Sequence, residues 1–408
     1  MIVLLLALLL CSPMLDNAYG GLWSYADESA TLLLAVWAVF SRSSVKRERD
    51  MLLSLSGLVV FILISFIGNA MFGYQPSAFA ILVDAFTCTK IFISYLAARI
   101  VLHSCTRCLS MFQIVGKIFV SCALIGLVLH VGGVIQLGSG REVFGVPCYQ
   151  FLFSHPTNLA AYCVGFAAIF FAGERPCVFW LISTIVLLVS TQRAKAVAMA
   201  FVLAFFLLYC LAKKDDRRPS FLVFLPIIVG VVFLGADSVN EYFIEGSGAR
   251  AMLLRDGFDI ALRSFPLGSG FATFGSYMSG IYYSPLYYEY GLNTIWGLSA
   301  VDPSFVSDSF WPAVLAQSGV LGFAALVLVG VAEYRLLRKD ARARSVRFIA
   351  YAAIPIYLFV LSTSDAAFFN YYGPFYALVL VSIVSRNSPN IKAYASGSDG
   401  KRTRLHRF

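Results

Sequence analysis

Apolar runs as long as a bilayer-spanning helix recur along the chain from one end to the other, and they restrict it to a fold built for lipid. About 20 residues of α-helix cross the hydrocarbon core of a bilayer. Charged residues make up only 13% of the 408 residues, whereas soluble domains carry roughly a quarter. The alternating pattern of an outer-membrane β-barrel is missing. The sequence therefore predicts an all-α polytopic membrane protein.

About twelve transmembrane helices are expected. They lie at residues 1–15, 22–40, 51–69, 77–98, 111–131, 157–172, 177–191, 195–212, 220–235, 312–332, 348–363 and 373–385. The first run lacks a positively charged n-region, which favours a short first helix over a cleaved signal peptide. We expect residues 1–385 to form a single transmembrane domain and the basic segment 386–408 to be a disordered cytoplasmic tail.

The distribution of lysine and arginine indicates how the helices are oriented. If both termini are cytoplasmic, the inside connections and the tail hold 23 of the 31 basic residues, the outside connections hold 6, and two lie within spans. Membrane proteins carry such an excess on their cytoplasmic side. The net charge of +9 is thus explained by orientation in a lipid bilayer, without a nucleic-acid partner.

One connection is far longer than the others. Residues 236–311 form an outer segment of 76 residues between the ninth and tenth predicted spans. Loops of this length are usually functional or disordered, and this one is dense in Tyr, Phe and Trp. We expect it to fold, partly as helix, against the outer membrane surface.

The sequence offers no site for a metal or a nucleotide. The pair in CTRC (Cys105, Cys108) has no second pair to complete a zinc site, and P-loop, HExxH and outer Asp-x-Asp motifs are absent. Only Asp84, Lys90 and Lys117 are expected as ionisable residues within the spans, and Asp84 and Lys90 do not share a helix face. That is little for a proton-coupled transporter. No cofactor and no metal are expected.

Three of the outer basic residues, Arg250, Arg255 and Arg263, lie in GSGARAMLLRDGFDIALRSFPLGSG, which predicts a short amphipathic helix. Gly268 and Gly270 follow it directly and allow backbone N–H groups to approach an anion closely. Guanidinium groups beside such a turn suit a diphosphate, because their donors match phosphate oxygens. An interfacial helix with its arginines on lipid headgroups explains the same pattern.

Two further outer cations, Arg193 and Lys195, sit in STQRAKAVAMAF, between two apolar runs with almost no loop. Each can extend its charge to the membrane surface at low cost, and both are candidates to bind an anionic substrate. His155, in SHPTNLAAY, is the histidine assigned to the outer side. It is a candidate base or proton shuttle, with a structural role at a helix start as the alternative.

Tyrosines and one aspartate complete the candidate site. Tyr282, Tyr283 and Tyr287 belong to YMSGIYYSPLYYEY, which suits either stacking on sugar rings or an aromatic belt at the membrane surface. Asp308, in SDSFWPAVLAQSGVLGF, lies where the chain re-enters the membrane. It is a candidate general base, with capping of the following helix as the alternative.

Taken in order, these motifs resemble those of the bacterial O-antigen and exopolysaccharide polymerases, relatives of the O-antigen ligases. The resemblance covers residues 150–323 and rests on SHPTNLAAY, STQRAKAVAMAF, RDGFDIALRSFPLGSGFATFGS and SDSFWPAVLAQSGVLGF. The ligases commonly carry a His-Asn pair where the large loop re-enters the membrane. Here Ser307, Asp308 and Ser309 occupy that place, which favours a polymerase.

The resemblance implies a membrane glycosyltransferase at the outer face of the bacterial inner membrane. Such enzymes join oligosaccharide repeats carried on polyprenyl diphosphate, without nucleotide or metal. It assigns Asp308, Arg255 and Arg263 to catalysis, and it assigns substrate binding to Arg193, Lys195, Arg250, Gly268, Gly270, Tyr282, Tyr283, Tyr287 and His155. Expected partners are the lipid-linked oligosaccharide, the bilayer, and a chain-length regulator and flippase of the same pathway. The alternatives are a flippase of lipid-linked oligosaccharide and a ligase that transfers finished glycan.

Overall fold

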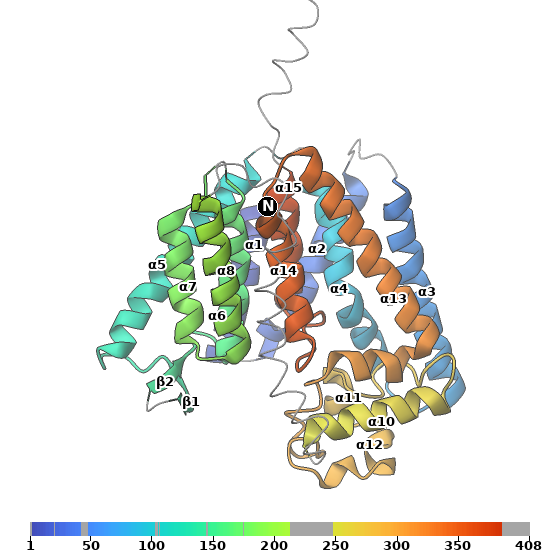
Figure 1. Ribbon diagram of the computed structural model, residues 1–408. Coiled ribbons are helices and arrows are strands. Elements are labelled where there is room, and N and C mark those ends of the chain that lie inside the picture. The colour runs from blue at the N-terminus through green and yellow to red at the C-terminus, as the bar shows by residue number, and fades with distance from the viewer. Residues whose placement is uncertain are drawn as a thin grey trace, which may run out of the picture.

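The computed structural model describes residues 2–19, 21–41, 48–102, 105, 107–143, 146–173, 175–212 and 248–385. The ninth predicted span (220–235), the start of the long loop (236–247) and the tail (386–408) lie outside the described residues. Figure 1 shows a helical bundle with one folded segment against one end. The longer bundle helices are α1 (Ile2–Tyr19), α2 (Ala26–Phe40), α3 (Arg49–Phe72), α4 (Ala78–Leu102), α5 (Cys108–Val131), α8 (Ala194–Ala212) and α13 (Phe310–Ala343). The shorter ones are α6 (Pro156–Phe171), α7 (Val178–Ser190), α14 (Phe348–Leu361) and α15 (Gly373–Val384).

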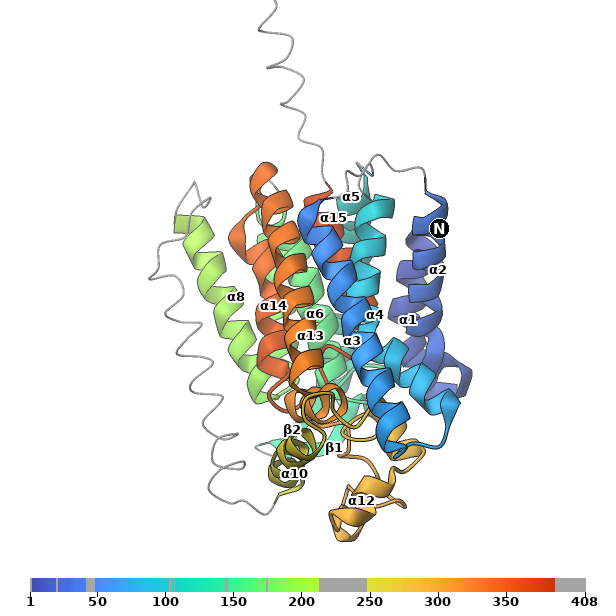
Figure 2. The ribbon, with the colours of Figure 1, turned by 90° about the vertical axis from the view of Figure 1, so that its right-hand side faces the viewer.

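From α1 to α8, and from α13 to α15, consecutive bundle helices run in alternating directions (Figures 1 and 2). Six of them, α1, α3, α4, α5, α8 and α13, are long and apolar enough to cross a membrane, and α6, α7, α14 and α15 are shorter apolar helices. Each predicted span within the described residues coincides with one helix, except that the span at 312–332 crosses a break in α13 at Gly319, whose φ and ψ (59° and −168°) are not helical. The structure is therefore that of an all-α membrane protein, and the total of about twelve spans stays a prediction.

The centre of the bundle is formed by α6 and α15. Nearly every residue of these two helices is buried, including the aromatic rings of Tyr162, Phe166, Phe375 and Tyr376. Apolar side chains on α3, α5 and α8 instead face outward, as a lipid environment requires. The bundle is thus apolar both inside and outside.

α13 continues beyond the predicted end of its span at residue 332 and reaches Ala343. Its added turns carry basic residues that the sequence assigned to a loop, because loop and helix end are equally polar. Arg99 on α4 bonds Asp340 (Nε to Oδ2, 2.9 Å) and Glu48 (Nη2 to Oε1, 3.0 Å), and Lys339 bonds Glu48 (2.7 Å). These ion pairs fix the extension to the neighbouring helices.

At the other end of the bundle, which we call the loop face, residues 248–309 fold against the start of α13 (Figure 1). This segment holds α10 (Ala249–Arg263), α11 (Tyr277–Ile281), α12 (Pro285–Glu289) and the short 3-10 helix η4 (Leu292–Thr294). It has a hydrophobic core of its own, with Leu253, Phe274, Tyr287 and Leu298 among its buried members. The loop face also carries the 3-10 helix η1 (Gly21–Tyr25) and a hairpin of β1 (Gly138–Val143) and β2 (Val146–Tyr149), paired antiparallel with Gly138 opposite Tyr149.

Candidate functional site: a charged mouth between a polar cavity and an apolar groove

Two of the predicted basic residues meet a pair of carboxylates at the loop face. Arg250, in the first turn of α10, places Nη2 2.9 Å from Oδ2 of Asp308. Lys195, in the first turn of α8, donates from Nζ to Thr363 Oγ1 (2.8 Å) and to the Ser364 hydroxyl, in the connection between α14 and α15. The next residue in that connection is Asp365.

The charges of Lys195, Arg250 and Asp308 all act on Asp365. Its pKa is raised from 3.8 to about 7, first by burial and then by the negative charge of Asp308, while the charges of Lys195 and Arg250 act in the opposite direction. A carboxyl group with a pKa near neutrality can hold or release a proton at physiological pH. We call Lys195, Arg250, Asp308 and Asp365 the charged mouth.

Asp308 does not cap α13. Ser309 is the N-cap residue of this helix, and Asp308 precedes it and pairs with Arg250. The capping interpretation is therefore wrong for Asp308. An ion-paired carboxylate is a weak proton acceptor, because the neighbouring cation stabilises its charged form.

His155 and Arg193 lie together on the same face of the bundle. His155 is the N-cap of α6, as its alternative interpretation proposed, and its Nε2 is 2.7 Å from Nη2 of Arg193 in the connection between α7 and α8. Arg193 is two residues from Lys195. The structure thus brings Arg193, Lys195 and Arg250 to the loop face, two of them in the charged mouth.

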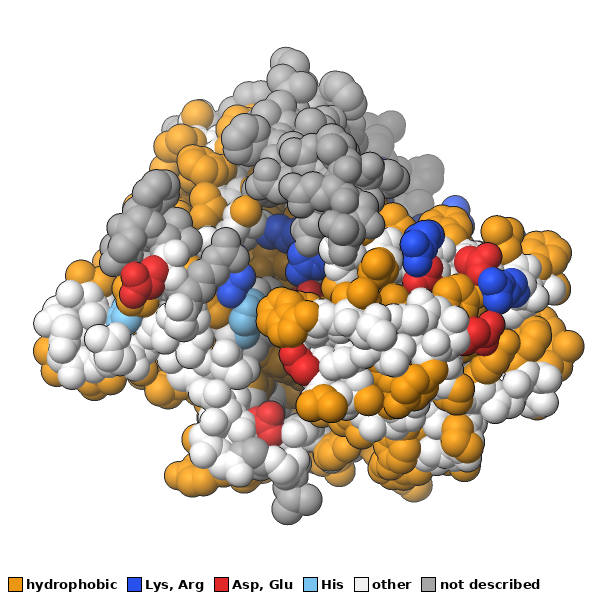
Figure 3. All heavy atoms as spheres, turned by 90° about the horizontal axis from the view of Figure 1, so that it is seen from below, with side chains coloured by type: hydrophobic (Ala, Val, Ile, Leu, Met, Phe, Trp, Pro, Cys, Tyr) orange, Lys and Arg blue, Asp and Glu red, His pale blue; other side chains and the backbone are white. Residues whose placement is uncertain are grey.

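Arg255 and Arg263 do not join this group, which corrects the prediction of a single cluster of cations. Arg255 pairs with its neighbour Asp256, and Arg263 pairs with Asp259 and Glu289. Their side chains are 67% and 61% exposed, against 30% for Arg250. Arg250 and Arg263 are 13 residues apart on one helix, which is about 20 Å along its axis. Figure 3 shows basic side chains in two separate places on the loop face.

The exposed side of α10 favours the interfacial interpretation for these two arginines. Phe258, Leu262 and Phe265 are exposed on and just beyond this helix, at the spacing of one helix face, beside Arg255 and Arg263. An apolar stripe flanked by arginines is typical of a helix that lies in the membrane interface.

The glycine-rich stretch is a packing element and does not form an anion cradle, which corrects the prediction for Gly268 and Gly270. The N–H of Gly268 donates to Ser264 O (3.0 Å), and that of Gly270 donates to Gln317 O (2.9 Å). Both glycines have positive φ, and a Cβ on Gly270 would lie 2.4 Å from the side chain of Asn69. Their N–H groups are thus used within the fold, and no side chain fits where they lie.

Polar side chains from three bundle helices hold this stretch in place. Asn69 on α3 donates to Phe271 O (2.9 Å) and accepts from Phe271 N (2.8 Å). Asp84 on α4 accepts from Ala272 N (2.6 Å), and Gln317 on α13 donates to Phe274 O (2.6 Å). The sequence did not identify these contacts, because each joins residues that lie far apart along the chain.

The tyrosine prediction is wrong for Tyr287 and is not supported for Tyr283. Tyr287 is fully buried, and its hydroxyl accepts from Gly275 N (2.8 Å) and bonds the Ser279 hydroxyl (2.6 Å). Tyr283 packs on Tyr287 and donates to Leu298 O (2.7 Å). Both stabilise the folded loop. Tyr282 is 41% exposed and lies against Phe79, outside the cavity described next.

A polar cavity of about 280 Å³ opens beside the charged mouth. It reaches from the loop face to the middle of α4, and Asp365 and Ser307, the neighbour of Asp308, line it. The other charged residues of its wall are Asp16, Asp27, Glu28, Asp84 and Lys90. Rings of Trp23, Tyr25, Tyr277 and Tyr371 and several serine hydroxyls complete the wall.

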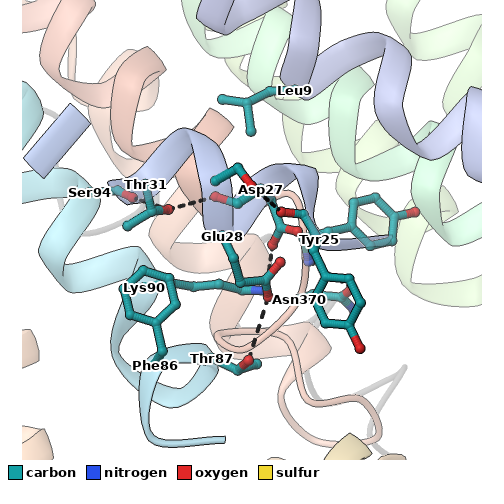
Figure 4. A network of polar contacts seen from close by, with 12 residues as sticks. Leu9, Tyr25, Asp27, Glu28, Thr31, Phe86, Thr87, Lys90, Ser94 and Asn370 are labelled. Atoms are coloured by element: carbon teal, nitrogen blue, oxygen red, sulfur yellow. Dashed lines mark hydrogen bonds and ion pairs between the residues drawn. The ribbon is translucent and has the colours of Figure 1, made fainter. Parts of the chain in front are cut away.

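Figure 4 shows the buried charges at the inner end of this cavity, where Lys90 extends from α4 toward the first turn of α2. Its Nζ is 2.5 Å from Asp27 Oδ2 and 2.8 Å from Glu28 Oε1. Asp27 and Glu28 lie within the predicted span 22–40, so the expectation that only Asp84, Lys90 and Lys117 are intramembrane charges is wrong. The signal was present, since a lone lysine in one apolar run requires a carboxylate partner from another.

A second cavity, an apolar groove of about 360 Å³, reaches the loop face close to the charged mouth. It is lined by α4, α13, α14 and α15, and Phe310, Trp311 and Phe368 line it close to the loop face. The Trp311 indole donates to Ser362 Oγ (3.1 Å), one residue before Thr363, which binds Lys195. The groove therefore meets the same connection that carries Asp365.

Among the described residues, no group of three or more His, Cys, Asp or Glu side chains is arranged to hold a metal ion. Cys105 and Cys108 form a disulfide at the end of the bundle opposite the loop face. Comparison with models of protein families, with curated proteins and with solved structures finds no match to this chain.

Proposed function

We propose that this protein joins oligosaccharide repeat units that are carried on polyprenyl diphosphate. The observation that carries the proposal is the charged mouth, where Lys195 and Arg250 meet Asp308 and Asp365 between a polar cavity and an apolar groove. A lipid-linked oligosaccharide has the same three parts in the same order: sugars, a diphosphate and an isoprenoid chain.

Each part of the substrate has a matching environment. Lys195 and Arg250 stabilise the diphosphate. When it leaves, each well-placed donor stabilises the developing negative charge by roughly 3–4 kcal/mol. The isoprenoid chain enters the groove past Phe310, Trp311 and Phe368. The sugars lie on the side of the polar cavity.

Asp365 takes the place that the sequence assigned to Asp308 as general base. The acceptor hydroxyl attacks the anomeric carbon of the donor, the bond from that carbon to the phosphate oxygen breaks, and the lipid diphosphate leaves with the electron pair. The hydroxyl proton passes to Asp365, whose pKa of about 7 suits proton transfer at neutral pH. Asp308 positions Arg250 through their ion pair.

We infer the location from the sequence. The excess of lysine and arginine at one end of the bundle supports a loop face on the outer side of the membrane, with both termini in the cytoplasm. The proposed substrate implies that this membrane is a bacterial inner membrane. The product would be an O-antigen, capsular or exopolysaccharide chain. A chain-length regulator and a flippase of the same pathway are the partners expected for such an enzyme.

A flippase of lipid-linked oligosaccharide is the second candidate. The observation in its favour is the buried Lys90, Asp27 and Glu28 cluster, because intramembrane charges often mark a substrate or proton pathway. The reaction product distinguishes the two functions, since a flippase moves the repeat unit without lengthening it.

The test uses the purified protein in lipid vesicles with a labelled polyprenyl-diphosphate repeat unit, without nucleotide or metal. We expect a ladder of products on a gel, formed at a rate that rises with pH up to about 7 and then levels off, because Asp365 must be deprotonated to accept a proton. The Asp365→Asn variant should lose most of the rate and this rise. Transfer of single, unextended repeats across the membrane would favour the flippase, and extension by Asp365→Asn at the normal rate would exclude Asp365 as the base.

A further inference from the structure

The wall of the polar cavity is strongly acidic. Five carboxylates line it, those of Asp16, Asp27, Glu28, Asp84 and Asp365, with Lys90 as the one basic side chain among its described lining residues. Lys90 is already paired with Asp27 and Glu28 (Figure 4). An anionic ligand in this cavity would therefore be repelled by the carboxylates, because the one described cation of the wall is already paired.

The same wall is rich in groups that bind hydroxyls. Carboxylates accept hydrogen bonds and, when ionised, cannot donate them, and sugar hydroxyls are donors. The Tyr371 hydroxyl is shielded from solvent and has no hydrogen-bond partner among the described residues. A buried hydroxyl of this kind is normally satisfied, and here it lines a cavity that a ligand can enter.

Aromatic rings complete the match to a carbohydrate. Trp23, Tyr25 and Tyr277 line the part of the cavity at the loop face. Such rings offer flat apolar faces next to polar rims, as a sugar ring does. A volume of about 280 Å³ lies near the lower end of the range for ligand pockets, ~300–1,000 Å³, so the cavity suits a short glycan end and not a long chain.

We propose that this cavity is the acceptor subsite, that it holds the terminal sugars of the acceptor, and that its acidic wall restricts them to hydroxyl-bearing sugars without a carboxylate. The identification of the bound sugar as the acceptor rests on the proposed function. The binding of sugar in the cavity does not depend on turnover. Uronic acids are excluded by charge, while the leaving diphosphate is held outside the cavity by Lys195 and Arg250.

The test measures the binding of lipid-free trisaccharides to the full-length protein in nanodiscs. The probes are trimers of glucose, galactose and N-acetylglucosamine, and trimers of glucuronic and galacturonic acid. We expect at least one neutral trimer to bind with a change in tryptophan fluorescence that is absent in Trp23→Phe, and we expect the uronate trimers to bind much more weakly. In Asp16→Asn with Glu28→Gln, the ratio of neutral to uronate affinity should fall on the order of tenfold for each carboxylate removed.

Asp302→Asn is the matched control, because it removes a carboxylate from the loop face outside the cavity. It should leave both affinities unchanged. Binding of uronate trimers as tight as that of neutral ones, binding of no neutral trimer, or an equal response of the control and cavity variants would overturn the inference. A protein that binds neutral trimers but forms no ladder would retain the sugar subsite and lose the polymerase function.

Discussion

Replacing Arg250 with alanine is expected to lower the rate of chain extension by about two to three orders of magnitude. Arg250 donates to Asp308 in the charged mouth, where we place the leaving diphosphate. The alanine removes a cation next to the developing negative charge and leaves Asp308 to repel it. The measurement is the initial rate of extension by purified protein at saturating lipid-linked repeat unit.

The matched controls for this variant are Arg255→Ala and Arg263→Ala on the same helix. Both side chains are largely exposed and pair with carboxylates away from the charged mouth, so extension should stay within about twofold of the normal rate. Arg250→Lys should retain part of the activity, because it keeps the charge but loses the forked donor geometry. Equal losses in all three alanine variants would contradict the division of the arginines into two groups.

Replacing Gly270 with alanine is expected to destabilise the protein by about 2–5 kcal/mol, since overpacking costs about 1–3 kcal/mol and a left-handed backbone adds ~1–2 kcal/mol. Its φ is +99°, and the new Cβ would lie 2.4 Å from Asn69 Cγ. Asn69 cannot withdraw freely, because it forms two hydrogen bonds with Phe271. The thermal unfolding midpoint in detergent measures the effect.

Gly291 and Gly73 separate the two causes of this loss. Both have positive φ (+68° and +63°), and a Cβ on either would meet nothing within 4 Å. Alanine at these positions should therefore cost only the backbone share, about 1–2 kcal/mol. If Gly270→Ala were no worse than Gly291→Ala, the tight packing of the glycine-rich stretch on α3 would be disproved.

The bundle was predictable from the sequence because hydropathy acts over one helix at a time. Each predicted span within the described residues corresponds to a helix, and the discrepancies lie in α13, which is broken at Gly319 within the predicted span and extends to Ala343. That extension depends on ion pairs with Arg99 and Glu48, which lie far away in sequence. Local patterns cannot reveal such pairs.

The site was predictable only in part, for the same reason. The sequence singled out Arg193, Lys195, Arg250, Asp308 and His155 as candidate site residues, and the structure brings them to the loop face. The sequence could not show that Gly268 packs tightly against α13 and Gly270 against α3, or that Tyr287 is buried in the loop core. These outcomes are set by tertiary packing.

The roles of Asp365 and of the Lys90 cluster could not be read from local sequence, because they depend on electrostatic interactions with residues far away in the chain. Asp365 is an ordinary loop aspartate in the sequence, and its pKa rises because the fold partly buries it and brings Asp308 close. Lys90 and its partners on α2 are separated by more than 60 residues. A search for pairs of opposite charges in different apolar runs would have found the second case.

The most direct test is an electron cryomicroscopy structure of the protein in nanodiscs with polyprenyl diphosphate bound. We predict density for the diphosphate between Lys195 Nζ and the Arg250 guanidinium, with the isoprenoid chain passing Trp311 into the groove between α13 and α14. Density for the diphosphate at Arg255 and Arg263, or an isoprenoid chain bound away from this groove, would contradict the account.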